Sequence, residues 1–256
     1  MKFKLLNYIT LTSILIILGL IFWYDLNWGF IFVPGIIWVL IVSIVSSNIQ
    51  WNFFLKSISK GNPEVNKIAL TFDDGPHPEF TPKVLELLEK YNAQATFFCI
   101  GRNVEKYPEI LVKIYENQHI IGNHSFTHSH KIDFNNKSKW LDEINSTDDK
   151  IQNIIGQKPQ FFRPPFGVTT PHLAKAIDET KHKVIGWNIR SFDTISNQNP
   201  DKIVKRILSK TKPGSIILLH DHLPGIFTIL EQLLPELQER NFTFVTVDEL
   251  INYESV

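Results

Sequence analysis

The first 55 residues carry almost no charge, and this feature constrains the chain more than any other. No charged residue occurs over 5–24, and after Asp25 none occurs over 26–55. Each stretch is long enough to cross a bilayer as a helix, which takes about 20 residues. We therefore predict a membrane anchor over 1–46, a hairpin of two transmembrane helices at about 5–24 and 28–46. A cleaved signal peptide is the alternative for the first stretch.

The lysines around this hairpin predict its orientation. Two precede the first stretch and two follow the second, namely Lys2, Lys4, Lys56 and Lys60. By the positive-inside rule, both ends of the hairpin and everything after it lie in the cytoplasm. Residues 47–65 are polar and are expected to form a linker to a globular domain over 66–256.

Composition excludes several classes of protein. The chain has 26 basic and 26 acidic residues, which argues against a strongly basic nucleic-acid binder. A hydrophobic content of 43% is too high for intrinsic disorder. The single cysteine, Cys99, excludes a disulfide framework and a zinc site built from several cysteines. Nothing in the sequence indicates an oligomeric state.

After residue 65, strand-like and helix-like segments alternate. Strands are predicted at 67–72, 95–100, 120–122, 160–162, 184–187, 215–219 and 242–245. Helices are predicted from about Thr81 and at 108–117, 139–155, 171–180, 200–212 and 224–239. This alternation indicates an α/β fold with a parallel sheet and helices outside it. We predict a distorted (β/α) barrel of about seven units, because polar residues follow several strands and barrel strand ends converge on one face. A doubly wound open sheet is the alternative.

Two of the polar clusters contain ligand-type side chains. Asp73 and Asp74 end an apolar strand, where two carboxylates are costly unless something uses their charge. His124 and His128 have the i, i+4 spacing that lets two imidazoles share one face of a helical turn and bind one ion. One carboxylate with two histidines suits zinc or another divalent transition metal. Solvated aspartates and surface histidines are the alternatives.

The other clusters offer groups for acid–base chemistry. Arg163 follows a strand beside two prolines and can hold a carboxylate bidentately. His220 ends a continuous apolar strand, and Asp193 follows a separate strand near Trp187. A histidine that an aspartate can approach fits a general acid, whereas a buried core histidine is the alternative.

In this order, the five motifs resemble the polysaccharide deacetylase family with its NodB homology domain. The resemblance covers about 66–247 and rests on TFDDGP at 71–76, HSFTH at 124–128, RPPFG at 163–167, the Trp187–Asp193 segment and ILLH at 217–220. It implies a distorted β/α barrel that removes N- or O-acetyl groups from glycans with the help of a metal ion.

The resemblance also implies a role for each matching residue. Metal ligands would be Asp74, His124 and His128. Asp73 would be the general base, tethered by Arg163, and His220 the general acid, oriented by Asp193. The substrate pocket would include Phe166, Trp187 and Leu218. Phe166 departs from the family, which often has tyrosine at that position.

We therefore expect a metal-dependent hydrolase acting on peptidoglycan, a chitin-like polymer or another cell-envelope glycan. The ion would be zinc, with cobalt, nickel or manganese as alternatives. Membrane lipid would contact the hairpin, and no nucleic acid is expected. The family's substrates favour a domain outside the cytoplasm, against the lysine distribution. Alternatives are a deacylase or deformylase of a lipid-linked sugar precursor and a glycan-binding pseudoenzyme.

Overall fold

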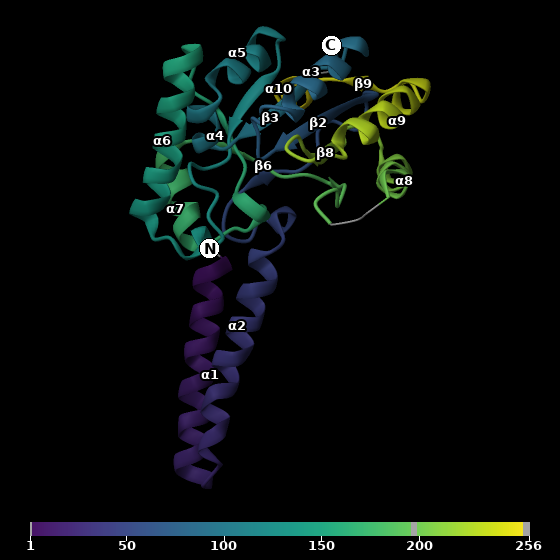
Figure 1. Ribbon diagram of the computed structural model, residues 1–256. Coiled ribbons are helices and arrows are strands. Elements are labelled where there is room, and N and C mark those ends of the chain that lie inside the picture. The colour runs from purple at the N-terminus through teal and green to yellow at the C-terminus, as the bar shows by residue number, and fades with distance from the viewer. Residues whose placement is uncertain (1, 196–198, 253–256) are drawn as a thin grey trace.

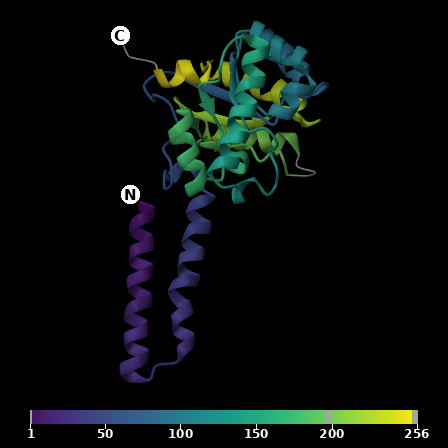
Figure 2. The same ribbon diagram turned by 90° about the vertical axis from the view of Figure 1, so that its left-hand side faces the viewer.

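The computed structural model describes residues 2–195 and 199–252, as a helical hairpin joined to an α/β domain (Figure 1). The hairpin consists of α1 (Lys2–Tyr24), a 3-10 turn η1 (Trp28–Phe32) and α2 (Val33–Ser46). Both helical stretches are apolar and long enough to cross a membrane, at 23 and 19 residues. Figures 1 and 2 show the two helices side by side, projecting from one end of the domain. The predicted hairpin therefore forms, at close to the expected positions.

The domain is built on one parallel sheet. Its strands are β1 (Ser57–Ile58), β2 (Lys67–Asp73), β3 (Ala95–Cys99), β4 (Ile120–Asn123), β5 (Phe161–Phe162), β6 (Lys183–Ile185), β7 (Ile189–Arg190), β8 (Ile216–His220) and β9 (Thr243–Phe244). Their order is β1-β6-β5-β4-β3-β2-β8-β7, with β9 paired to β2. Within the described ranges no pairing joins β1 to β7, so the sheet is a curled half-barrel. The predicted distorted (β/α) barrel is confirmed in this open form.

Helices cover the outside of the curled sheet. They are α3 (Phe80–Lys90), α4 (Gly101–Lys106), α5 (Pro108–Glu116), α6 (Lys137–Ile155), α7 (Pro171–Thr180), α8 (Pro200–Lys210), α9 (Ile226–Glu239) and α10 (Val247–Asn252). α6 packs against α4, α5 and α7, while α9 packs against α3 and α8. Thr81, expected to open a helix, lies inside the first turn of α3 instead. Its hydroxyl accepts a hydrogen bond from the His77 N–H and donates to Asp221.

The segment expected as a linker, 47–65, contributes a strand to the sheet. Ser57 and Ile58 of β1 pair with Val184 and Ile185 of β6. Just before β1, the short turn η2 (Ile49–Trp51) buries Ile49 against the domain. A two-residue strand is too short for its hydrophobic period to be read from sequence. At the other end, residues 196–198 and 253–256 of the expected domain lie outside the described residues.

Alternate residues of the central strands face two different cores. In β2, Ile68, Leu70 and Phe72 pack in the layer under the outer helices, whereas Ala69 packs inside the half-barrel. Side chains of a strand alternate between the two faces of a sheet. Asp73 therefore shares the inner face with Ala69, at the carboxyl end of the strand. This places a carboxylate at the inner rim of the half-barrel.

Candidate active site

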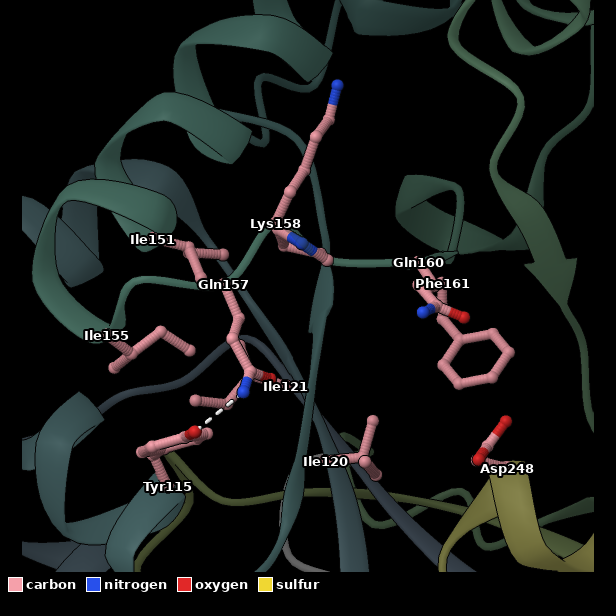
Figure 3. Close-up of a pocket in the computed structure, with 11 residues that line it drawn as sticks. Tyr115, Ile120, Ile121, Ile151, Ile155, Gln157, Lys158, Gln160, Phe161 and Asp248 are labelled. Atoms are coloured by element: carbon pink, nitrogen blue, oxygen red, sulfur yellow. Dashed lines mark hydrogen bonds between the residues drawn. The ribbon is translucent and has the colours of Figure 1, made fainter.

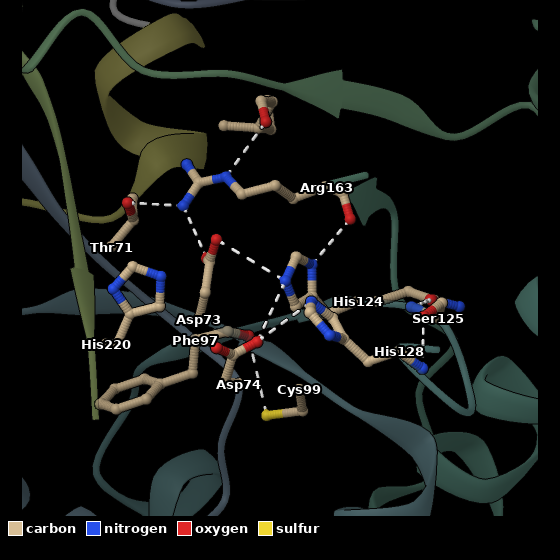
Figure 4. Close-up of polar contacts among 12 residues, drawn as sticks. Thr71, Asp73, Asp74, Phe97, Cys99, His124, Ser125, His128, Arg163 and His220 are labelled. Atoms are coloured by element: carbon tan, nitrogen blue, oxygen red, sulfur yellow. Dashed lines mark hydrogen bonds and ion pairs between the residues drawn. The ribbon is translucent and has the colours of Figure 1, made fainter. Parts of the chain in front are cut away.

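A pocket of about 230 Å³ opens at the carboxyl ends of the strands. Its lining contains eight of the ten predicted site residues, namely Asp73, Asp74, His124, His128, Phe166, Trp187, Leu218 and His220, together with Gly167, Arg190 and Thr194. The two remaining predicted residues, Arg163 and Asp193, bind Asp73 and His220 by hydrogen bonds. All ten predicted site residues thus belong to one cluster, parts of which Figure 4 shows.

Arg163 fixes the position of Asp73. The guanidinium is fully buried, and its Nη1 donates to Asp73 Oδ1 at 2.8 Å and to Thr71 Oγ1 at 2.8 Å. Its Nε and Nη2 donate to the carbonyls of Ile185 and Gly186. A buried cation needs such partners for all its donors. Arg163 therefore holds one oxygen of Asp73 rigidly, while the other, Oδ2, lies 3.7 Å from His124 Nε2 (Figure 4).

Asp74, His124 and His128 form a group that fits a metal ion. Their potential ligand atoms all lie within 4.8 Å of one another. Asp74 Oδ1 lies 3.5 Å from His124 Nε2 and 3.3 Å from His128 Nε2. This oxygen is buried and has no hydrogen-bond donor among the described residues. An unpartnered buried oxygen facing two imidazole nitrogens matches the donor set of zinc and similar divalent ions.

The protonation of these groups bears on metal binding. Burial alone would raise the pKa of Asp74, but His124, His128 and His220 hold it well below its usual value. Burial and the neighbouring His124 lower the pKa of His128 to about 4. Burial opposes protonation of His124, yet Asp73 and Asp74 raise its pKa overall. An ionised Asp74 and a neutral His128 have the lone pairs that a metal ion requires of its ligands.

His124 is oriented by its second nitrogen. Its Nδ1 lies 2.7 Å from the carbonyl oxygen of Arg163, so Nδ1 carries the hydrogen and donates. Its Nε2 is then the nitrogen turned towards Asp74. The same Arg163 thus positions Asp73 with its side chain and His124 with its backbone.

The expectation that His124 and His128 lie on a helical turn is wrong. They lie in the loop after β4, where Ser125 and His128 have positive φ angles of 65° and 48°. Glu143 of α6 accepts hydrogen bonds from the N–H groups of Phe126 and Thr127, which holds the loop in place. The i, i+4 spacing brings the imidazoles together here through a loop held by α6, which spacing alone does not predict.

His220 forms a second pair with Asp193. Its Nδ1 lies 2.8 Å from Asp193 Oδ1, and its backbone N–H donates to Oδ2 at 2.8 Å. Ser191 Oγ also donates to Asp193. Burial opposes the charge, but Asp193 raises the pKa of His220 to about 9. His220 is therefore protonated at neutral pH, and it pairs in register with Asp73 across β2 and β8.

The predicted wall residues come from three different elements. Phe166 lies in the turn η4 (Pro165–Gly167), Trp187 follows β6 and Leu218 lies in β8. Gly167 has a φ of 71°, and a Cβ there would lie 2.4 Å from the Trp187 ring. The close approach of this turn to the indole therefore requires glycine.

The sequence motifs did not assign two titratable neighbours of the site, His222 and Asp221. His222 Nδ1 lies 3.5 Å from Asp74 Oδ2. Asp221 is buried under Gly75 and accepts from Thr81 Oγ1 at 2.5 Å, and burial raises its pKa to about 7. The run His220-Asp221-His222 was the available signal. Its second and third residues follow the end of β8, where direction cannot be deduced from strand alternation.

A second cavity, of about 110 Å³, lies between β4, α6 and α10 (Figure 3). Its polar side chains are those of Tyr115, Gln157, Lys158, Gln160 and Asp248, and Gln157 donates a hydrogen bond to the Tyr115 hydroxyl. It contains no cluster of titratable groups among the residues shown in Figure 3. The pocket at the strand ends is therefore the candidate active site.

Comparison with known proteins agrees with this site. The family model described as polysaccharide deacetylase matches residues 60–185. A peptidoglycan-N-acetylglucosamine deacetylase of Bacillus cereus is 36% identical over 202 residues, covering 73% of this chain and 89% of that protein. The chain belongs to the polysaccharide deacetylase family. Members of this family depend on a metal ion, which accords with the Asp74, His124 and His128 group.

Two further relatives extend the comparison. The peptidoglycan-N-acetylmuramic acid deacetylase PdaA of Bacillus subtilis is 31% identical, covering 75% of this chain and 73% of that protein. The crystal structure of the Bc1960 peptidoglycan N-acetylglucosamine deacetylase superposes with a TM-score of 0.72 at 33% identity. It covers 77% of this chain and 92% of that one. The relatives thus include deacetylases named for either peptidoglycan sugar.

Proposed function

We propose that this protein is a membrane-anchored, metal-dependent deacetylase that removes acetyl groups from an amino sugar of the cell envelope. The observation that carries the proposal is the complete acid–base pair in one pocket. An oriented carboxylate, Asp73, and a protonated imidazole, His220, line the same cavity as the metal-binding group. Hydrolysis of an amide needs both a proton acceptor and a proton donor. Peptidoglycan is the first candidate substrate, because the curated relatives are named for it.

Each side chain has a role that follows from its position. When bound to Asp74, His124 and His128, a divalent ion, zinc by its donor set, would polarise the acetyl carbonyl and activate water. Asp73 would accept the proton of the attacking water. His220 would donate its proton to the leaving amine, and Asp193 would keep it charged and oriented. Phe166, Trp187 and Leu218 would enclose the acetyl group and the sugar.

The hairpin is proposed to lie in a membrane. Its apolar side chains are largely exposed, and Phe22, at 84%, is an example. An apolar surface of this size needs a lipid or protein partner. The flanking lysines favour a domain on the cytoplasmic side, whereas a wall polymer requires the opposite side. A reporter fused to the C-terminus would decide between the two.

A glycan-binding pseudoenzyme would lack part of the catalytic group. Here the metal-binding residues, the carboxylate and the imidazole are all present and oriented, which supports an active enzyme over that alternative.

Acetate release tests the proposal. The full chain in detergent would be assayed on peptidoglycan, acetylated chitin oligomers and acetylated xylan, with zinc and with a chelator. We expect release that requires both the metal and Asp73. A metal-loaded protein that releases acetate from none of these saccharides would contradict the proposed function.

A further inference from the structure

The chain leaving the second apolar helix rests on the wall of the active-site pocket. The carbonyl oxygen of Ser46, the last residue of α2, accepts a hydrogen bond from the Thr169 N–H at 2.9 Å. Gln50 Nε2 donates to the carbonyl oxygen of Trp187 at 2.7 Å. Trp187 lines the pocket, and Thr169 follows Gly167, which also lines it. The pocket wall and the end of the helix are therefore in direct contact.

The start of the first helix meets the same junction. Lys2 Nζ approaches the carbonyls of Trp51 and Asn52, and the Phe3 ring packs edge-on against Phe54 at 5.3 Å. The start of α1 and the end of α2 thus both meet the segment 46–54 at the edge of the domain. Two attachment points oppose rotation of the domain about the hairpin axis.

The direction of the strands gives the pocket its orientation. The amino end of β2 lies beside α10, where Lys67 Nζ is 2.7 Å from Glu249 Oε1. In Figures 1 and 2, α10 lies at the end of the domain away from the hairpin. The strands therefore run towards the hairpin, and their carboxyl ends, with the pocket, face the same side as the apolar helices.

An exposed cation lies in the lining of this pocket. Arg190 of β7 is exposed, and its guanidinium lies over the Phe192 ring at 5.2 Å. No carboxylate of the described residues lies within ion-pair distance of it. A guanidinium that lines a pocket and has no carboxylate partner among the described residues is suited to bind an anion of the ligand, such as a phosphate.

From these observations we infer that the pocket faces the bilayer surface and takes an N-acetylated saccharide carried on a membrane lipid through phosphate, with Arg190 binding the phosphate. This inference rests on the proposed function and specifies its substrate class. An enzyme and a substrate held in one membrane meet at a raised effective concentration. The phosphate on C1 of a 2-acetamido sugar is adjacent to the acetamide, so one pocket can hold both groups.

Lipid-quenching measurements test the orientation without any assay of activity. Cys99 is buried, so a new surface cysteine can be labelled alone. A fluorophore would be placed at Thr194→Cys, in the pocket lining, or at Glu116→Cys, the last residue of α5, near the amino end of β4. In vesicles with spin-labelled headgroups, we expect quenching at residue 194 and little at residue 116. Equal quenching at both positions, or stronger quenching at 116, would overturn the inference.

Acetate release from vesicles tests the substrate class. The full chain would be given one N-acetylated disaccharide in three forms: soluble, on a lipid through phosphate, and on a lipid through a neutral linker. We expect the phosphate-linked form to be hydrolysed about 100-fold faster than the soluble form. Arg190→Gln should remove the advantage of phosphate over the neutral linker, whereas Arg240→Gln, a surface control at the residue that follows α9, should not.

The outcomes separate the two proposals. Acetate from the soluble disaccharide at a rate equal to that from the lipid forms overturns the membrane substrate and leaves the deacetylase standing. A lipid advantage that is the same with and without phosphate overturns the role of Arg190. No acetate from any form, with metal bound, overturns the proposed function and with it the substrate class.

Discussion

Two carboxylate–cation pairs flank the pocket, and they present opposite partners to it. In the Asp73–Arg163 pair the cation is fully buried behind the carboxylate. In the Asp193–His220 pair the carboxylate is the buried member, and the imidazole faces the pocket. Both pairs have a closest distance of 2.8 Å. The same type of ion pair therefore presents a proton acceptor, Asp73, at one position of the pocket lining and a proton donor, His220, at another. The member that lines the pocket decides the role.

The choice of cation reinforces this difference. Arginine keeps its charge at any physiological pH, so Arg163 serves to orient Asp73 and does not itself exchange a proton. An unpaired histidine loses its proton near neutral pH. The pairing with Asp193 therefore determines the pH range over which His220 is charged. A permanent cation suits the support of a base, and a titrating cation suits an acid.

Asp73→Asn should have the largest effect, because it removes the proton acceptor while keeping the shape of the side chain. We expect acetate release to fall by about 10²–10⁴-fold. Metal content should be retained, since Asp73 is not in the metal-binding group. Asp74→Asn is the matched control, expected to lose both metal and activity. Loss of metal from the Asp73 variant would show that Asp73 is a ligand and not a base.

His220→Gln should separate the second pair from the first. On an N-acetyl sugar, we expect a fall of about 10²–10⁴-fold, because the amine cannot leave without a proton. On 4-nitrophenyl acetate, whose phenolate leaves unprotonated, the loss should be much smaller. Asp73→Asn should lower turnover of both substrates by about the same 10²–10⁴-fold. Equal losses on amide and ester in the His220 variant would contradict its role as an acid.

The members of both pairs, and their position at one end of the sheet, could be predicted from the sequence. Asp73 and His220 each end a continuous apolar strand, and parallel strands of a barrel bring such ends to one face. The family motifs then named Arg163 and Asp193 as their partners. The sequence does not show which member of each pair lines the pocket, because this depends on packing from distant elements, such as that of Phe98 and Trp187 against Arg163.

Several of the shortest helices and strands also could not be predicted from the sequence. β1, β7, α4 and α10 are two to six residues long, too short for a periodic pattern. The same reason explains the error at 124–128, where a loop fixed by Glu143 replaces the expected helical turn. Tertiary hydrogen bonds determine that conformation, and local spacing does not encode them.

Asp193→Asn should shift the pH profile with a smaller loss of maximal activity. His220, with a pKa raised to about 9, stays protonated and active below that pH. Without the carboxylate, its pKa should fall to its ordinary 6.5 or below, because burial lowers it. Activity at pH 8 should then drop about 30-fold, since a pKa of 6.5 leaves about 3% of the histidine charged.

A pH–rate profile from pH 5 to 10 would check this shift. The contribution of the Asp193–His220 pair to the free energy of unfolding should also decrease as the pH rises. It is complete below pH 6.5 and lost as the pH rises through about 9, because the folded state raises the pKa of His220. An unchanged basic limb in the Asp193 variant would contradict the proposed coupling.

Arg163→Lys should have the smallest effect on chemistry, and it tests whether charge or shape supports Asp73. Lysine keeps a cation beside the carboxylate but loses the planar fork that reaches Thr71, Ile185 and Gly186 together. Two carbonyls are then left without donors in a buried site, at a cost of about 1–3 kcal/mol each. We expect a clear fall in unfolding free energy by denaturant titration and only a modest fall in kcat. Arg240→Lys, at an exposed pair with Glu236, should change neither. If Arg163→Lys lowered kcat as far as Asp73→Asn without destabilising the protein, the guanidinium would have a direct catalytic role, and the first pair would be as chemically active in its cation as the second.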